Sequence, residues 1–152
     1  MTLKRNEIIF ATGFYSGFAP IAKGTFGSIF AFLFYLIPGF ENPYFIIPLI
    51  LITFFYGVKV CSKMEDLLGK DPGECTIDEF VGTWISLLFL PKKMEIILIA
   101  FLIWRILDIL KPQPAKFMEK FERGWGVMLD DVVSGFYTAL ILHFALYAGI
   151  FH

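Results

Sequence analysis

The stretch GWGVMLDDVVSGFYTALILHFALYAGIF, residues 124–151, places two adjacent aspartates ahead of a long apolar run. After Asp130 and Asp131, no Asp, Glu, Lys or Arg occurs in the rest of the chain. The apolar block at residues 129–151 is 23 residues long, within the roughly 17–25 that a membrane-spanning helix needs. The stretch therefore predicts a helix that can cross a bilayer and that carries two carboxylates near one end.

The composition of the whole chain agrees with a membrane protein. Of its 152 residues 57% are hydrophobic and 18% charged, whereas a soluble domain has about 45–50% and about 25%. The net charge is −1 and no basic stripe with interleaved aromatics occurs, which argues against a nucleic-acid partner. The two cysteines, Cys61 and Cys75, fit neither a zinc spacing nor a C-x-x-C motif, so we expect them to be apolar filler.

Four more apolar blocks precede the last one, at residues 26–40, 43–60, 77–90 and 94–110. Those at 43–60, 94–110 and 129–151 are long enough to span a bilayer, while the other two are short. We therefore predict one domain, residues 1–152, with an all-α fold. It would be a polytopic membrane bundle of about four to five apolar helices.

Basic residues are distributed unequally between the two sides of this bundle. With the N-terminus inside and Arg105 set aside as intramembrane, ten Lys and Arg residues lie on the inner side and only Lys92 and Lys93 on the outer side. Because cytoplasmic loops carry an excess of Lys and Arg, this bias fixes the orientation. Among the acids only Glu41 and Glu95 fall on the outer side, so an acid-rich site is expected at the cytoplasmic helix ends.

Two matched acid pairs begin the blocks at 77–90 and 129–151. Asp78 and Glu79 are followed by Gly82, and Asp130 and Asp131 by Gly135. A glycine one turn later would let the two helices approach closely. Neighbouring residues on a helix point about 100° apart, so we expect one acid from each pair, rather than both, to serve a small ligand.

Clustered carboxylates repel one another and need a cation, and an oxygen-only ligand set suits Mg²⁺. Asp108 lies at the cytoplasmic end of the block at 94–110 and would join the two pairs. Each acid could instead have a purely structural role, because carboxylates in the first turn of a helix interact favourably with the helix dipole. Five acids from three helix ends nevertheless favour a functional site.

Cations lie close to these acids in the sequence. Arg105 and Asp108 are three residues apart and share a helix face, and an arginine inside an apolar block is costly unless it is paired. The same guanidinium, and Lys111, could also bind a phosphate. A structural ion pair and a phosphate contact both remain open for Arg105.

A glycine-rich segment, YSGFAPIAKGTFGS at residues 15–28, precedes the first apolar block. Glycines, Lys23, Thr25 and Ser28 ahead of a helix are a general arrangement for binding an anion, although close helix packing uses the same residues. The segment is not a Walker A loop, because Lys23 stands before Gly24 rather than after the second glycine of that motif.

Together the segments GFAPIAKGTFGS, DPGECTIDEFVGTW, RILDILKPQPAKFMEK and GWGVMLDDVVSG resemble the phosphatidylglycerophosphatase A family over nearly the whole chain. One departure is Lys23, where the family usually has a proline before Gly-Thr. The resemblance implies a Mg²⁺-dependent phosphatase that converts phosphatidylglycerophosphate to phosphatidylglycerol. It also implies a multi-pass protein of the bacterial inner membrane with its site facing the cytoplasm.

Carried over by position, the resemblance implies the following site residues. The metal ligands would be Asp78, Glu79, Asp130 and Asp131, with Asp108 next. The chemistry of the residues, rather than the resemblance, indicates Asp131, Glu79 and Asp108 as catalytic acids and Arg105, Lys111, Lys23, Thr25 and Ser28 as phosphate contacts.

The sequence also bears on other mechanisms and functions. No Cys-x5-Arg and no D-x-D motif occurs, which favours metal-assisted attack of water, although a carboxylate nucleophile such as Asp131 stays open. The rival function is a small cation carrier or channel, which predicts acids along the depth of several helices. A non-catalytic assembly subunit is a second rival, and the sequence leaves homo-oligomerisation open.

Overall fold

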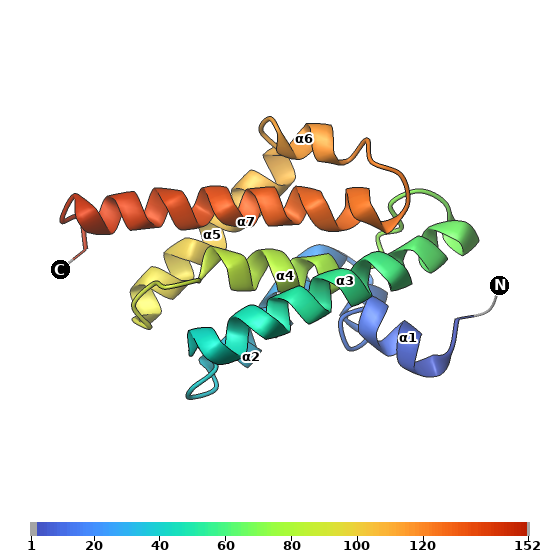
Figure 1. Ribbon diagram of the computed structural model, residues 1–152, viewed down its shortest axis with the longest axis horizontal. Helices are drawn as coiled ribbons and strands as arrows, with labels where there is room; N and C mark the ends of the chain where they lie inside the picture. Colours follow the sequence, from blue (N-terminus) through green and yellow to red (C-terminus); the bar gives the residue numbers. More distant parts are fainter. Residues whose placement is uncertain (1–2, 152) are drawn as a thin grey trace.

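A computed structural model describes residues 3–151, and within that range the chain contains helices and no strand. Figure 1 shows the helices along the chain. In order they are α1 (Arg5–Ala11), the 3-10 helix η1 (Ser16–Phe18), α2 (Lys23–Leu36), α3 (Pro43–Leu68), α4 (Ile77–Ser86), α5 (Met94–Leu110), α6 (Ala115–Met118) and α7 (Gly124–Tyr147). The all-α prediction is confirmed, and each of the five apolar blocks contains one helix.

Two of these helices, α3 and α7, are long and apolar enough to cross a membrane. Helices α2, α4 and α5 have 14, 10 and 17 residues, so the expected membrane bundle of about four to five apolar helices is confirmed only for α3 and α7. The most apolar 18-residue window of α3 is only 28% buried. A core helix of a soluble protein would be mostly buried, so the exposed apolar surface of α3 indicates a hydrocarbon environment.

Local sequence explains where α3 begins and ends. Pro43 occupies the first turn, where its missing N–H has no partner to lose, and the Asn42 side chain accepts a hydrogen bond from the Tyr44 N–H at 3.0 Å. Gly69 follows the last turn with φ +97°, a conformation that favours glycine. The helix therefore has 26 residues and continues two turns beyond the apolar block, carrying Cys61 and Glu65 to the acid-rich end.

Helix α4 is the centre of the bundle and packs against α2, α3, α5 and α7. The predicted close approach at the paired glycines is confirmed. A methyl group at Gly135 would lie 2.7 Å from the Gly82 carbonyl oxygen, and one at Gly82 would lie 2.6 Å from the Trp104 ring. Bulkier residues would push α7 and α5 away from α4, so these glycines bring the acids of α4 and α7 together.

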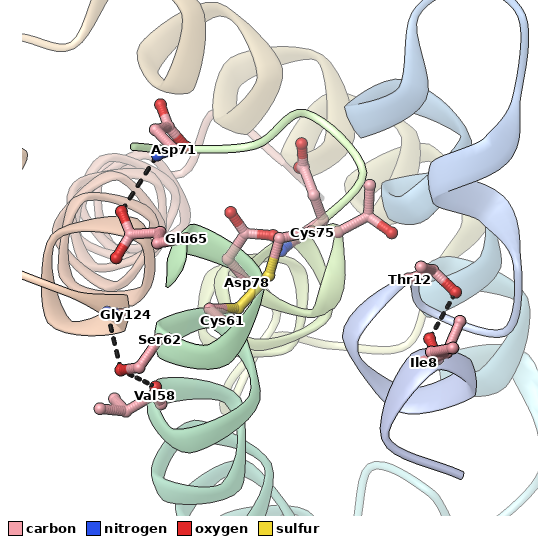
Figure 2. The surroundings of a disulfide bond; sticks show 12 residues. Ile8, Thr12, Val58, Cys61, Ser62, Glu65, Asp71, Cys75, Asp78 and Gly124 are labelled. Carbon is pink, nitrogen blue, oxygen red and sulfur yellow. Dashed lines mark hydrogen bonds between the residues drawn. A yellow bond between two sulfur atoms is a disulfide. The ribbon is translucent and has the colours of Figure 1, made fainter. Parts of the chain in front are cut away.

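A disulfide joins Cys61 on α3 to Cys75 in the segment before α4, with 6.1 Å between the Cα atoms. The prediction that these cysteines are unlinked filler is wrong, because a pairing across 14 positions depends on tertiary packing that sequence spacing does not reveal. Figure 2 shows Asp78 beside the bridge. The link holds the segment ahead of α4 against α3 and so helps to place the first turn of α4.

Candidate active site

Three buried carboxylates meet where α5 and α7 come together. One oxygen each from Asp108, Asp130 and Asp131 lies within 4.8 Å of the other two. The three residues are at most 8% exposed. Like charges held this close in a buried place repel strongly, so the group needs a positive partner when it is ionised.

Two oxygens of these carboxylates have no hydrogen-bond partner within the part of the chain that the structure describes. Among the described residues, Asp130 Oδ1 and Asp131 Oδ2 are buried and accept no hydrogen bond. Buried polar atoms nearly always have a partner, so these two oxygens are free to bind a ligand. Carboxylate oxygens are ligands that Mg²⁺ prefers. The three carboxylates therefore fit a divalent cation, which they would hold through one oxygen each.

Two details of this group differ from the sequence-based expectation. Asp130 and Asp131 both contribute an oxygen, although one acid per pair was expected. The side chains of neighbouring residues leave the helix in different directions, but their own torsions can bend both carboxylates toward Asp108. Asp108, which was expected to be a metal ligand only after the four paired acids, belongs to the three-carboxylate group. Asp78 and Glu79 do not belong to it.

Glu79 belongs instead to a network centred on Arg105. Nη1 of Arg105 donates to Glu79 Oε2 at 2.6 Å and to Asp108 Oδ2 at 2.8 Å. The Ser28 hydroxyl donates to the same Glu79 oxygen at 2.8 Å. Of the two roles left open for Arg105, the ion pair with Asp108 is present, and the bonds to Glu79 and Ser28 join α2, α4 and α5 beside the three-carboxylate group.

The start of α2 lies directly against this network. A methyl group at Gly24 would overlap Glu79 Oε1 and would lie 3.3 Å from Arg105 Nη2. A larger residue at this position would force the Glu79 carboxylate to move away from the start of α2. Gly24 was not among the predicted site residues, although its place in the Gly-Thr pair of the glycine-rich segment was a usable signal.

Lys111 closes another side of the group. Its Nζ donates to Asp130 Oδ2 at 2.5 Å and to Glu119 Oε1 at 2.6 Å. Burial by itself disfavours the charged amine, but the Asp130 carboxylate and the two hydrogen bonds outweigh it and raise the pKa of Lys111 above its usual value. Lys111 therefore stays protonated and offsets part of the negative charge.

The other two residues expected to contact phosphate lie elsewhere. Lys23 Nζ pairs with Glu74 at 2.5 Å, in the segment before α4, and this hydrogen bond lowers the pKa of the Glu74 carboxyl. Thr25 is half-buried in the first turns of α2. Neither is among the residues that contact the three carboxylates, so their role in binding phosphate stays a prediction.

A pocket of about 300 Å³ gives access to Asp130. Its other lining residues come from the end of α3, the following turn, and the region from α6 to α7: Glu65, Lys70, Asp71, Glu119, Gly126 and Val127. In Figure 2 the Glu65 side chain points toward Asp71, whose N–H it accepts at 3.0 Å. Sequence analysis missed Glu65 and Glu119 as site residues, because single acids on polar helix ends look like solvated surface.

Removing the charge of Arg105 should destabilise the fold. We expect Arg105→Met to lower the free energy of unfolding by about 3–5 kcal/mol, because it leaves the buried Glu79 and Asp108 without their cation. Arg105→Lys should recover part of the loss, since an ammonium keeps the charge but lacks the guanidinium's fork of donors. Denaturant unfolding in detergent micelles measures both.

Arg123→Met is the matched control, because Arg123 pairs with Asp66 at the surface, where its side chain is 61% exposed. An exposed pair of this kind contributes under about 1 kcal/mol. If Arg105→Met unfolded at the same denaturant concentration as Arg123→Met, the Arg105 network would have no structural role.

Comparison with known proteins identifies the family of the chain. Residues 9–146 match the sequence profile of the family described as Phosphatidylglycerophosphatase A. No solved structure matches the chain.

Three curated relatives cover most of the chain. A protein of Bacteroides thetaiotaomicron with the provisional name phosphatidylinositol-3-phosphatase is 36% identical over 89% of this chain and 90% of its own. Phosphatidylglycerophosphatase A of Escherichia coli strain K12 is 35% identical over 90% of this chain and 81% of its own. Phosphatidylglycerophosphatase A of Haemophilus influenzae is 36% identical over 88% of this chain and 85% of its own. The resemblance seen in the sequence motifs is thereby confirmed, and the chain belongs to the phosphatidylglycerophosphatase A family.

Proposed function

We propose that this protein is a Mg²⁺-dependent phosphatase that removes the terminal phosphate of phosphatidylglycerophosphate to give phosphatidylglycerol. Family membership supports the reaction class and the lipid. The observation that carries the chemistry is the group of Asp108, Asp130 and Asp131, with two buried oxygens that accept no hydrogen bond among the described residues.

Asp108, Asp130 and Asp131 would hold the metal, with Asp78 and Glu79 beside them on α4. When bound, Mg²⁺ supplies positive charge that polarises the phosphoryl group and lowers the pKa of a coordinated water. The three carboxylates bring the negative charge that such an ion needs, and Arg105 and Lys111 keep the rest of the site from carrying excess negative charge.

The protein's own groups account for the proton transfers and the developing charge. A carboxylate near the attacking water takes its proton as the new P–O bond forms, with Asp131 and Glu79 as the candidates. The ester P–O bond then breaks, and the glycerol oxygen takes up a proton and leaves as the alcohol. Arg105 and Lys111 would offset charge on the phosphoryl oxygens, with Lys23, Thr25 and Ser28 as further contacts.

The protein would be a multi-pass protein of the bacterial inner membrane with this site at the cytoplasmic face. The exposed apolar surfaces of α3 and α7 support insertion, and the excess of basic residues on one side supports the orientation. In that placement the lipid tails stay in the bilayer while the phosphate reaches the acids. Whether two chains associate remains a prediction.

The rival reading as a cation carrier or channel is less well supported. It requires acids along the depth of the helices, whereas Asp108, Asp130 and Asp131 form one group and α7 has no Asp or Glu after residue 131.

Phosphate release from a panel of lipids tests the proposal. With Mg²⁺, we expect kcat/KM on phosphatidylglycerophosphate to exceed that on phosphatidic acid or a phosphatidylinositol phosphate by at least about tenfold, because polar groups around the headgroup discriminate by hydrogen bonding. Equal rates on all three lipids would contradict the substrate assignment. No release from any of them would contradict the enzyme assignment and favour the carrier.

A further inference from the structure

The disulfide between Cys61 and Cys75 lies at the acid-rich end of the bundle. Cys61 is about two turns before the end of α3, and one residue separates Cys75 from α4. Glu65, one turn after Cys61, lines the same pocket as Asp130. In Figure 2 Asp78, in the first turn of α4, lies beside the two sulfur atoms. The bond therefore belongs to the same end of the molecule as the candidate active site.

The proposed orientation puts this bond in a reducing compartment. The excess of Lys and Arg supports a cytoplasmic location for the acid-rich end. Thiols in the cytoplasm are kept reduced, and disulfides that do form there are usually transient and catalytic or redox-sensing. A permanent bond between Cys61 and Cys75 would be exceptional at this place, whereas a bond that opens and closes with the redox state of the cell would not.

The turn in front of Cys75 gives a route to the bond. Residues 69–74 contain no helix or strand, and most of them are exposed. Cys75 itself is 5% exposed, whereas Cys61 on α3 is fully buried. Local opening of the turn would expose the Cys75 sulfur to an attacking thiolate, with the Cys61 sulfur as the leaving group.

The disulfide is a covalent link between α3 and the segment that leads into α4. On the other side of this segment, the Thr76 N–H donates to the Ala11 carbonyl at 2.9 Å, and the Thr76 hydroxyl lies 3.0 Å from that of Ser16. Toward α3, the Asp71 N–H donates to Glu65 at 3.0 Å. Opening the disulfide would leave the start of α4 held by hydrogen bonds and packing alone, and would make it more mobile.

The first turn of α4 is coupled to the site through Glu79. Arg105 Nη1 donates to Glu79 at 2.6 Å, and the same nitrogen donates to Asp108 of the three-carboxylate group at 2.8 Å. A first turn that is held in place keeps the Glu79 carboxylate on this guanidinium. The state of the disulfide therefore bears on the charge balance beside the proposed metal ligands.

We propose that Cys61 and Cys75 form a redox switch that fixes the first turn of α4 when the pair is oxidised and loosens it when the pair is reduced. In the reducing step a thiolate of a cellular dithiol attacks the Cys75 sulfur, the S–S bond breaks, and the Cys61 thiolate leaves and takes up a proton. The second thiol of the dithiol then displaces Cys75 as a thiol, so two electrons and two protons pass to the pair and the dithiol becomes a disulfide. The switch rests on the proposed cytoplasmic orientation and does not require phosphatase activity.

Counting free thiols in cells tests the switch. The chain has two cysteines, so a maleimide tag added after acid quenching shifts the reduced protein by two tags and the disulfide form by none. In bacteria that express the full chain we expect two tags, none after the thiol oxidant diamide, and two again once diamide is removed. Cys61→Ala is the control for tagging, because its single thiol should take one tag in untreated cells.

Purified protein in detergent tests the effect on α4. Dithiothreitol should lower the unfolding temperature by roughly 6–12 °C, because the bond no longer restricts the unfolded chain. It should also speed amide hydrogen exchange in residues 77–81 by at least about tenfold, while residues 139–147 of α7 stay unchanged. Cys61→Ala should behave like the reduced protein and ignore dithiothreitol. Val60→Ala, at a neighbouring buried position that leaves the pair intact, is the matched control and should keep the full response.

Three outcomes would overturn the proposal. A pair that takes no tag in untreated cells would be a permanent structural bond. A pair that takes two tags both after diamide and in purified protein exposed to air would form no bond at all. Equal exchange rates in residues 77–81 with and without dithiothreitol would show that the bond does not act on α4. Tag counts and exchange rates do not depend on turnover, so a protein that releases no phosphate would contradict the proposed function and leave this test intact.

Discussion

Asp131→Asn is expected to lower kcat by at least about 1,000-fold while leaving the fold intact. Asparagine has nearly the same shape, so the α4–α7 packing is kept, but the substitution removes a charge from the three-carboxylate group. The loss combines a weakened metal site with loss of a proton acceptor, and general-base catalysis alone contributes about 10²–10⁴-fold. Phosphate release from phosphatidylglycerophosphate under saturating substrate measures it.

The stability of the same variant separates catalysis from folding. Without metal, Asp131→Asn should unfold at the same temperature as the unsubstituted protein or higher, because one of three mutually repelling carboxylates has been neutralised. Asp66→Asn, in a surface pair with Arg123, is the control and should keep normal turnover. Turnover within a few-fold of normal in Asp131→Asn would exclude a catalytic or ligand role for this residue.

Patterns that are local in the sequence predicted much of the fold. The apolar blocks became helices because their length and composition leave few alternatives in hydrocarbon. The spacing of Arg105 and Asp108 predicted an ion pair within one helix turn, and that pair is present. Gly82 and Gly135 were expected to permit close approach, and Gly135 of α7 does lie against the Gly82 carbonyl of α4, while the open side of Gly82 faces Trp104 of α5.

The features of the site that the sequence did not predict depend on contacts between distant segments. Arg105 reaches Glu79 across 26 positions, and the same nitrogen donates to Asp108, so the guanidinium links Glu79 to the three-carboxylate group. The disulfide and the approach of Gly24 to Glu79 likewise arise from the packing of different segments. The number of helices that cross the bilayer could not be predicted, because apolar composition does not distinguish a short helix packed in the bundle, such as α4, from one that crosses the bilayer.

Removing divalent metal should reduce phosphate release to background, and adding Mg²⁺ should restore it. Asp108, Asp130 and Asp131 bring three carboxylates within 4.8 Å of one another, and without a cation their charges would repel the phosphate of the substrate as well as one another. Treatment with EDTA followed by dialysis against Mg²⁺ measures the loss and the recovery. The required Mg²⁺ concentration should rise in Asp131→Asn, because a ligand charge is missing.

Thermal unfolding gives a readout of the metal that does not depend on turnover. A ligand that binds only the folded protein stabilises it by about 2.7 kcal/mol at a concentration 100 times its Kd, so Mg²⁺ should raise the unfolding temperature of the unsubstituted protein. The rise should be smaller in Asp131→Asn and unchanged in Asp66→Asn, whose substituted carboxyl is not in the buried group. Full turnover after EDTA treatment would exclude the metal mechanism, and an equal rise in all three proteins would place the metal at another site, because only Asp131→Asn alters the proposed ligands.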